Sequence, residues 1–143
     1  MRHGSKKIKV KLGKDANKML MRKLTVNFIK TGKITTTEKK AKMLKTYLEK
    51  IVEKTKVDMQ ANKNYLLSAL ADSKLVKQLF LSVGPAVAGR IGGYVKMQKL
   101  YQRDSDGALM VKLEWSSPVV IEEPQKIVKS KIEGEVIAEP TQK

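Results

Sequence analysis

The feature that most constrains this chain is its positive charge, which is spread unevenly along the sequence. In 143 residues, 30 Lys and Arg stand against 14 Asp and Glu, which gives a net charge of +16. Residues 1–50 carry 16 basic and 3 acidic side chains, residues 51–100 carry 8 and 3, and residues 101–143 carry 6 and 8. A field of this strength requires an anionic partner. We therefore expect a nucleic-acid-binding surface built mainly from the N-terminal half.

Length and composition limit what this basic chain can be. The length fits one compact domain with a tail, and a hydrophobic fraction of 41% with only 5% aromatics predicts a core of Leu, Ile, Val and Met. The absence of cysteine excludes a disulfide scaffold and a cysteine-based zinc site. Lysines interrupt the apolar residues near the N-terminus, and no apolar run approaches the roughly 20 residues of a membrane span. We expect a soluble, cytosolic protein.

Helical periodicity dominates the first 90 residues. Residues 15–31 form a predicted helix, with Asp15 as N-cap, Leu20, Leu24 and Phe28 on its apolar stripe, and Gly32 at its end. A second helix is predicted to start near Thr36, because Thr35 and Glu38 have capping-box spacing. Its apolar stripe consists of Ala41, Leu44, Leu48, Ile51 and Val52. Two shorter helices over residues 64–71 and 73–83 follow, and Gly84-Pro85 should break the pattern before a brief helical turn through Val87.

Three segments have the composition or alternation of strands. Residues 32–37 are β-branched, and residues 94–101 alternate in the way of a strand. After a turn at residues 104–107, a returning strand should direct Leu109, Val111, Leu113 and Trp115 inward. Together these segments predict a small sheet covered on one side by the helices.

The chain divides into three parts. Residues 1–14 form a basic arm, residues 15–115 a globular domain, and residues 116–143 an extension with Pro118, Pro124 and Pro140 and no aromatic residue. The extension could dock on a neighbouring surface through its short aliphatic segments or remain a disordered tail, and composition alone does not decide between the two.

The residues that enzymes and metal sites require are scarce. A single histidine, His3, and no cysteine leave no nucleophile and base pair and no metal ligand set. Asp104, Asp106 and Gly107 begin like a calcium loop, but the later ligands are missing, which favours a hairpin turn. The glycines at 89, 92 and 93 lead into a strand and not into a helix, unlike a dinucleotide-binding loop. We expect no enzyme activity, no cofactor and no metal.

Taken in order, four motifs resemble the bacterial-type family of large-subunit ribosomal proteins numbered seventeen. The likeness covers residues 1–115. The motifs are the opening Met1-Arg2-His3-Gly4; Ile34-Thr35-Thr36-Thr37 followed by Lys40-Ala41-Lys42 and Leu44; Leu75, Val76, Leu79 and Phe80 before Arg90-x-Gly92-Gly93-Tyr94; and Asp106, Met110 and Glu114. The resemblance implies an α+β fold, with about four helices packed on one face of a small mixed three-stranded sheet.

The resemblance also implies a function. It predicts a structural constituent of the cytoplasmic ribosome that binds large-subunit rRNA near the nascent-chain tunnel exit, contacts neighbouring ribosomal proteins, and supports subunit assembly and translation. Basic side chains would neutralise phosphates, two glycines would permit close backbone approach, and His3 or Tyr94 could stack on a base. The candidate RNA-binding residues are Arg2, His3, Lys6, Lys7, Lys9, Lys11, Lys14, Lys18, Arg22, Lys33, Thr36, Lys39, Lys40, Lys42, Arg90, Gly92, Gly93, Tyr94 and Lys96.

Alternatives remain at this stage. Tyr94 could instead be a strand residue packed on the sheet, since aromatics favour strands. A basic DNA-binding architectural or regulatory protein would carry a similar charge, although no helix-turn-helix spacing is evident. A peripheral membrane protein would need an exposed Trp, Phe and Leu edge that the cationic helix faces lack.

Overall fold

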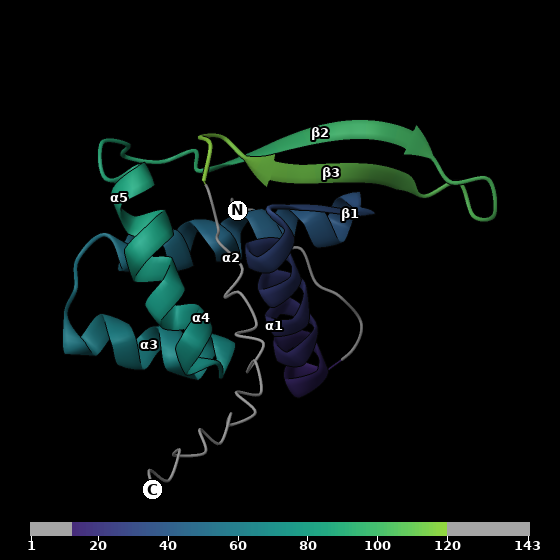
Figure 1. Ribbon diagram of the computed structural model, residues 1–143. Helices are drawn as coiled ribbons and strands as arrows, with labels where there is room; N and C mark the ends of the chain where they lie inside the picture. Colours follow the sequence, from purple (N-terminus) through teal and green to yellow (C-terminus); the bar gives the residue numbers. More distant parts are fainter. Residues whose placement is uncertain (1–12, 120–143) are drawn as a thin grey trace, which may run out of the picture.

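Helices cover one face of a three-stranded sheet in the computed structural model, which describes residues 13–119 (Figure 1). The predicted α+β class is therefore confirmed. Most of the predicted basic arm, and the extension from residue 120 onward, lie outside the described residues. The elements are α1 (Lys14–Thr31), β1 (Lys33–Thr37), α2 (Glu38–Thr55), α3 (Gln60–Leu70), α4 (Ser73–Gln78), the π-helical turn η1 (Leu79–Val83), α5 (Gly84–Val87), β2 (Val95–Gln102) and β3 (Leu109–Trp115).

The sheet has the order β1-β3-β2 and is antiparallel throughout. The expectation of a mixed sheet was wrong: β2 and β3 form a hairpin, and β1 runs against the other side of β3. The inward face of β3 is the predicted one, since Val111 and Leu113 are fully buried. Thr36 of β1 lies opposite Val111, and Met97 of β2 lies opposite Leu113. The inner sides of all three strands thus face the helical layer.

Helix α1 ends where the sequence predicts and buries a slightly different stripe. Gly32 adopts a left-handed conformation with φ of 72°, and its N–H donates to the carbonyl of Phe28 at 2.8 Å. At the other end the capping position belongs to Gly13, so the prediction of Asp15 as N-cap was wrong by two residues. The buried positions are Met21, Thr25, Phe28 and Ile29. Phe28 packs on the Trp115 ring, with centroids 4.7 Å apart, which turns the helix toward the sheet.

Helix α2 occupies the centre of the molecule. The predicted stripe is confirmed, because Ala41, Leu44, Leu48, Ile51 and Val52 are all fully buried. The helix starts at Glu38 and not near Thr36, since Thr35 and Thr36 are paired with β3. The N-cap residue Thr37 makes no side-chain capping bond, so the predicted capping box does not form. Pairing in the sheet has overridden a local capping signal.

The chain remains helical through Gly84-Pro85, where the sequence predicted a break. After α4, whose N-terminus is capped by the Asp72 carboxylate, the backbone widens into the π-helical turn η1 and continues into α5. Pro85 lies in the first turn of α5, where the fixed φ of proline suits the helical backbone. A Cβ on Gly84 would lie 2.8 Å from the carbonyl oxygen of Thr55. Only glycine allows this segment to pass so close to the end of α2.

Candidate nucleic-acid interface

The outer face of the sheet gathers basic side chains around a single carboxylate. Because Val111 and Leu113 point inward, Lys112 and Glu114 lie on the opposite face, which the helices leave open (Figure 1). In the strand register Glu114 is flanked by Lys33 of β1 and Lys96 of β2. The Lys112 ammonium lies 2.7 Å from the Glu114 carboxylate. One row across three strands therefore carries cations on both sides of one anion.

The pKa of Glu114 reports this surplus of positive charge. It is lowered from 4.5, first by the hydrogen bond and charge of Lys112, and further by the charges of Lys96 and Lys33. Three ammonium groups act on one carboxylate, so this face keeps a net positive charge at neutral pH. The open face is suited to phosphate oxygens.

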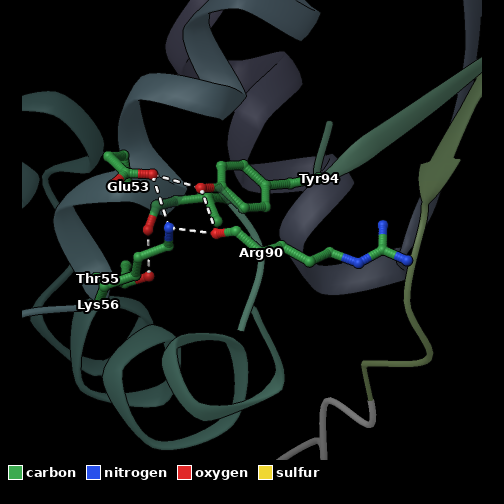
Figure 2. A network of polar contacts seen from close by, with 6 residues as sticks. Glu53, Thr55, Lys56, Arg90 and Tyr94 are labelled. Carbon is green, nitrogen blue, oxygen red and sulfur yellow. Dashed lines mark hydrogen bonds and ion pairs between the residues drawn. The ribbon is translucent and has the colours of Figure 1, made fainter. Parts of the chain in front are cut away.

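A polar network holds the loop that leads into β2 (Figure 2). The Tyr94 hydroxyl donates to the carboxylate of Glu53 near the end of α2, and it also lies 3.2 Å from the carbonyl oxygen of Arg90. The Lys56 ammonium donates to the same Arg90 carbonyl at 2.5 Å and pairs with Glu53 at 3.0 Å. The base of the loop is thereby tied to the end of α2.

Charge and burial stabilise this network. The hydrogen bond from Tyr94 lowers the pKa of Glu53, and contacts with Lys56 lower it further. Hydrogen bonding to Tyr94 and to Glu53 raises the pKa of Lys56, whose ammonium lies 5.0 Å from the centre of the Tyr94 ring. Tyr94 is only 2% exposed. Its ring therefore offers no face to a base, which argues against the predicted stacking on RNA. The side chain is packed, as in the alternative, but Tyr94 precedes β2 and contacts the end of α2 instead of lying in the strand.

The remainder of the loop faces outward. Figure 2 shows the Arg90 guanidinium directed away from the network, while the Arg90 carbonyl faces Lys56 and Tyr94. Nothing lies within 4 Å of a Cβ built on Gly92 or Gly93, and Gly93 has a φ of 68°. The two glycines leave the backbone accessible to a close ligand.

The loop and the basic row lie at the same end of the sheet. The N–H of Ser116 donates to the carbonyl of Tyr94 at 2.9 Å, and Val95 is paired with Trp115 one residue beyond Glu114. We call this combined region the sheet–loop surface. It consists of Lys33, Lys96, Lys112, Arg90, Gly92 and Gly93.

Other predicted residues lie apart from this surface. At the start of α2, Lys39 is exposed and Lys42 pairs with Glu38 at 2.8 Å, at the opposite end of β1 from Lys33. The hydrogen bond from Lys42 lowers the pKa of Glu38. Lys40, predicted with them, is half-buried, and Thr36 is 8% exposed on the inner face, a position that argues against a side-chain contact with RNA.

Helix α1 divides its basic residues between two roles. The Arg22 guanidinium donates to the carbonyls of Ala69 and Ser68 at 2.9 and 2.8 Å, so it caps the end of α3. Lys14 and Lys18 are exposed on the first turns, at the end of α1 that points away from the sheet (Figure 1). An 18-residue helix is about 27 Å long, which separates them from the sheet–loop surface. Arg2, His3, Lys6, Lys7, Lys9 and Lys11 lie outside the described residues.

Sequence reasoning missed Lys112. The signal was available, because the predicted inward set of Leu109, Val111, Leu113 and Trp115 places residue 112 on the outer face. Within residues 13–119, no three His, Cys, Asp or Glu side chains are placed together to hold a metal ion. No helix in that part of the chain is long and apolar enough to cross a membrane.

Comparison with known proteins identifies relatives over most of this structure. A profile of the family "Ribosomal protein L17" matches residues 20–116. The large ribosomal subunit protein bL17 of Carboxydothermus hydrogenoformans is 39% identical over 106 residues, which are 73% of this chain and 95% of that protein. The bL17 protein of Natranaerobius thermophilus is 40% identical over 106 residues, which are 74% of this chain and 94% of that protein. The matched residues include the whole sheet–loop surface.

Proposed function

Since the chain belongs to the ribosomal protein L17 family, we propose that it binds large-subunit rRNA through the sheet–loop surface. Family membership confirms the resemblance predicted from the motifs. It also makes the chain a structural component of the large ribosomal subunit, in the cytoplasm, and not an enzyme. The residues that contact RNA and the position in the subunit are our proposal.

The distribution of charge on the outer face supports RNA binding. Neighbouring strands lie about 4.8 Å apart, so Lys33 and Lys96, on the two outer strands, are about 10 Å apart. Glu114 of β3 lies between them, and Lys112 lies two residues along β3 on the same face, so that all three ammonium groups act on this carboxylate. Two ammonium groups can contact neighbouring phosphates while the third neutralises the carboxylate.

The loop adds a contact with defined geometry. The Arg90 guanidinium can bind a phosphate with two parallel hydrogen bonds. Gly92 and Gly93 have no neighbour that would keep a sugar or phosphate from the backbone. Because Lys56 and Tyr94 already hold the Arg90 carbonyl, less conformational entropy is lost when the loop binds.

The remaining basic residues extend the proposed contact. Lys39, Lys40 and Lys42 at the start of α2, Lys14 and Lys18 on α1, and the basic residues of positions 2–11 would bind further phosphates. We propose a location near the nascent-chain tunnel exit, with neighbouring ribosomal proteins as further partners, and a contribution to subunit assembly.

The proposal rests mainly on the basic side chains around Glu114. Removing their charge tests whether they bind rRNA. In the full chain, Lys33→Gln, Lys96→Gln and Lys112→Gln should together weaken binding to large-subunit rRNA. Each lost phosphate contact should reduce the slope of log affinity against log salt by about 0.7 to 0.9. The control is Lys50→Gln, Lys54→Gln and Lys74→Gln, which removes the same charge from exposed positions elsewhere. Equal slopes for the two triple variants would refute the sheet–loop surface as the contact.

The proposed location in the subunit and the choice between RNA and DNA as partner are tested separately. Subunits assembled with a cleavage reagent on a cysteine introduced at Lys54 should be cut in rRNA around the tunnel exit, and cuts elsewhere would refute that location. Duplex DNA of matched length, used as competitor in the binding assay, tests the alternative of a DNA-binding protein. Competition as strong as that of rRNA would favour that alternative.

A further inference from the structure

An apolar groove lies on the side of the helical layer away from the sheet. Its volume is about 420 Å³, and its apolar lining comes from Leu67 of α3, Val76 of α4, and Phe80 and Leu81 of η1. Leu81 is 78% exposed and Leu67 is 38% exposed. In Figure 1, α3 and α4 lie below α2 and α5 and far from the strands. The groove is therefore separate from the sheet–loop surface, and the apolar part of its lining does not suit phosphates.

Lysines border this groove. Lys63 and Lys77 belong to its lining, and Lys74 is exposed one turn from Lys77. Lys63 pairs with Asp58 at 2.7 Å and lies 5.9 Å from the centre of the Phe80 ring. Within residues 13–119, no carboxylate is paired with Lys74 or Lys77. The groove thus fits a segment that is both apolar and acidic.

The sequence contains such a segment near its C-terminus. Residues 132–139 read IEGEVIAE, with three glutamates, no lysine or arginine, and the aliphatic residues Ile132, Val136 and Ile137. Such a composition is unusual in a chain with a net charge of +16. The spacing of Ile132 and Val136 would place both on one face of a helix, and alternate residues would share one face of an extended strand.

We propose that residues 132–139 dock in cis into the groove between α3, α4 and η1. The aliphatic side chains would cover Leu67, Val76 and Leu81, and the glutamates would lie beside Lys74 and Lys77. The length of the connection permits this. The described chain ends at Val119, and the 13 steps to Ile132 span up to about 45 Å when extended.

Two further quantities favour docking within one molecule. A folded chain of this length has a radius of gyration of about 14 Å, so the connection reaches any face of the domain. A tethered segment also has an effective concentration of about 1 mM near its site, so even a weak interaction is populated.

Because the chain contains no cysteine, a pair of introduced cysteines can test the docking by disulfide formation. In the full chain, Ser73→Cys places a thiol on the groove lining and Ala138→Cys places one in the segment. The matched control combines Ser105→Cys, at the exposed hairpin turn, with Ala138→Cys. With oxidised glutathione, the Ser73 pair should form an intrachain disulfide at least tenfold faster than the Ser105 pair.

Charge reversal separates docking from random collision. Adding Glu133→Lys, Glu135→Lys and Glu139→Lys to the Ser73 pair should reduce its rate to that of the control pair. Equal rates for the two original pairs would overturn the proposal, and so would a fast rate that survives charge reversal. Disulfide-linked dimers as the main product at low protein concentration would also overturn it, because the groove would then receive a second copy.

Discussion

At the start of α2, the side chains of Lys39 and Lys42 extend toward solvent, whereas at its end the Lys56 ammonium is held over a tyrosine ring and bonded to a backbone carbonyl. The side chain of Lys42 is 46% exposed and that of Lys56 only 16%. One helix therefore carries lysines for two different purposes. The side chain alone does not decide between them; the neighbouring chain segments do, because the loop before β2 and the start of α5 contact the end of the helix.

The largest effect is expected from the packed end of α2. Gly84→Ala would place a Cβ 2.8 Å from the Thr55 carbonyl oxygen, a backbone atom that cannot rotate away. We expect the free energy of unfolding to fall by about 2 to 3 kcal/mol, as for other overpacked sites. Denaturant titration measures this change. The control is Gly89→Ala, where a Cβ would meet nothing within 4 Å. Equal losses in the two variants would show that close packing is not what distinguishes this end.

A smaller loss is expected when the network loses its tyrosine hydroxyl. Tyr94→Phe keeps the buried ring but removes the donor to Glu53, so stability should fall by about 1 kcal/mol. Amide hydrogen exchange should increase in residues 88–93 and stay unchanged in β3, since the network anchors the loop base. RNA affinity should fall as well, because the loop becomes less ordered. Unchanged exchange in the loop would contradict the positioning role.

At the start of α2, changes in charge should leave stability almost untouched. Lys39→Gln, Lys40→Gln and Lys42→Gln remove cations that oppose the helix dipole, an effect of about 0.3 to 1 kcal/mol each at most. Lys42→Gln also removes the ion pair with Glu38, and this loss offsets part of the gain in stability. The melting temperature should therefore change by only a few degrees, while the affinity for rRNA falls. A large drop in melting temperature with unchanged affinity would make these lysines structural.

The difference between local side-chain spacing and contacts with distant chain segments explains which predictions from sequence succeeded. Apolar periodicity located the core of α2 and the inward face of β3, because burial follows side-chain spacing directly. The capping box and the break at Gly84-Pro85 failed, since pairing of Thr36 with β3 and packing of Gly84 against Thr55 involve residues distant in sequence. The charge of the chain indicated a nucleic-acid partner and could not separate the roles of individual cations. Arg22 and Tyr94 have structural contacts whose partners lie 47 and 41 residues away.

The smallest effects concern two carboxylates on α2, and they test whether its ends act independently. Both Glu38 and Glu53 have pKa values lowered from 4.5, the first mainly by the hydrogen bond from Lys42 and the second mainly by that from Tyr94. Each depressed carboxyl contributes stability that is present above pH 4.5 and is lost as the pH falls through its lowered value. Lys42→Gln should raise the pKa of Glu38 alone, and Tyr94→Phe that of Glu53 alone, as measured by carboxyl carbon chemical shifts in an NMR titration.

Salt should distinguish the two carboxyls further. The charge of an ammonium partner at the surface is screened by salt, whereas a hydrogen bond from a neutral hydroxyl is not. In 1 M salt the pKa of Glu38 should therefore return toward 4.5 more fully than that of Glu53. If both carboxyls responded to either substitution, or equally to salt, the two ends of α2 would form one coupled electrostatic unit.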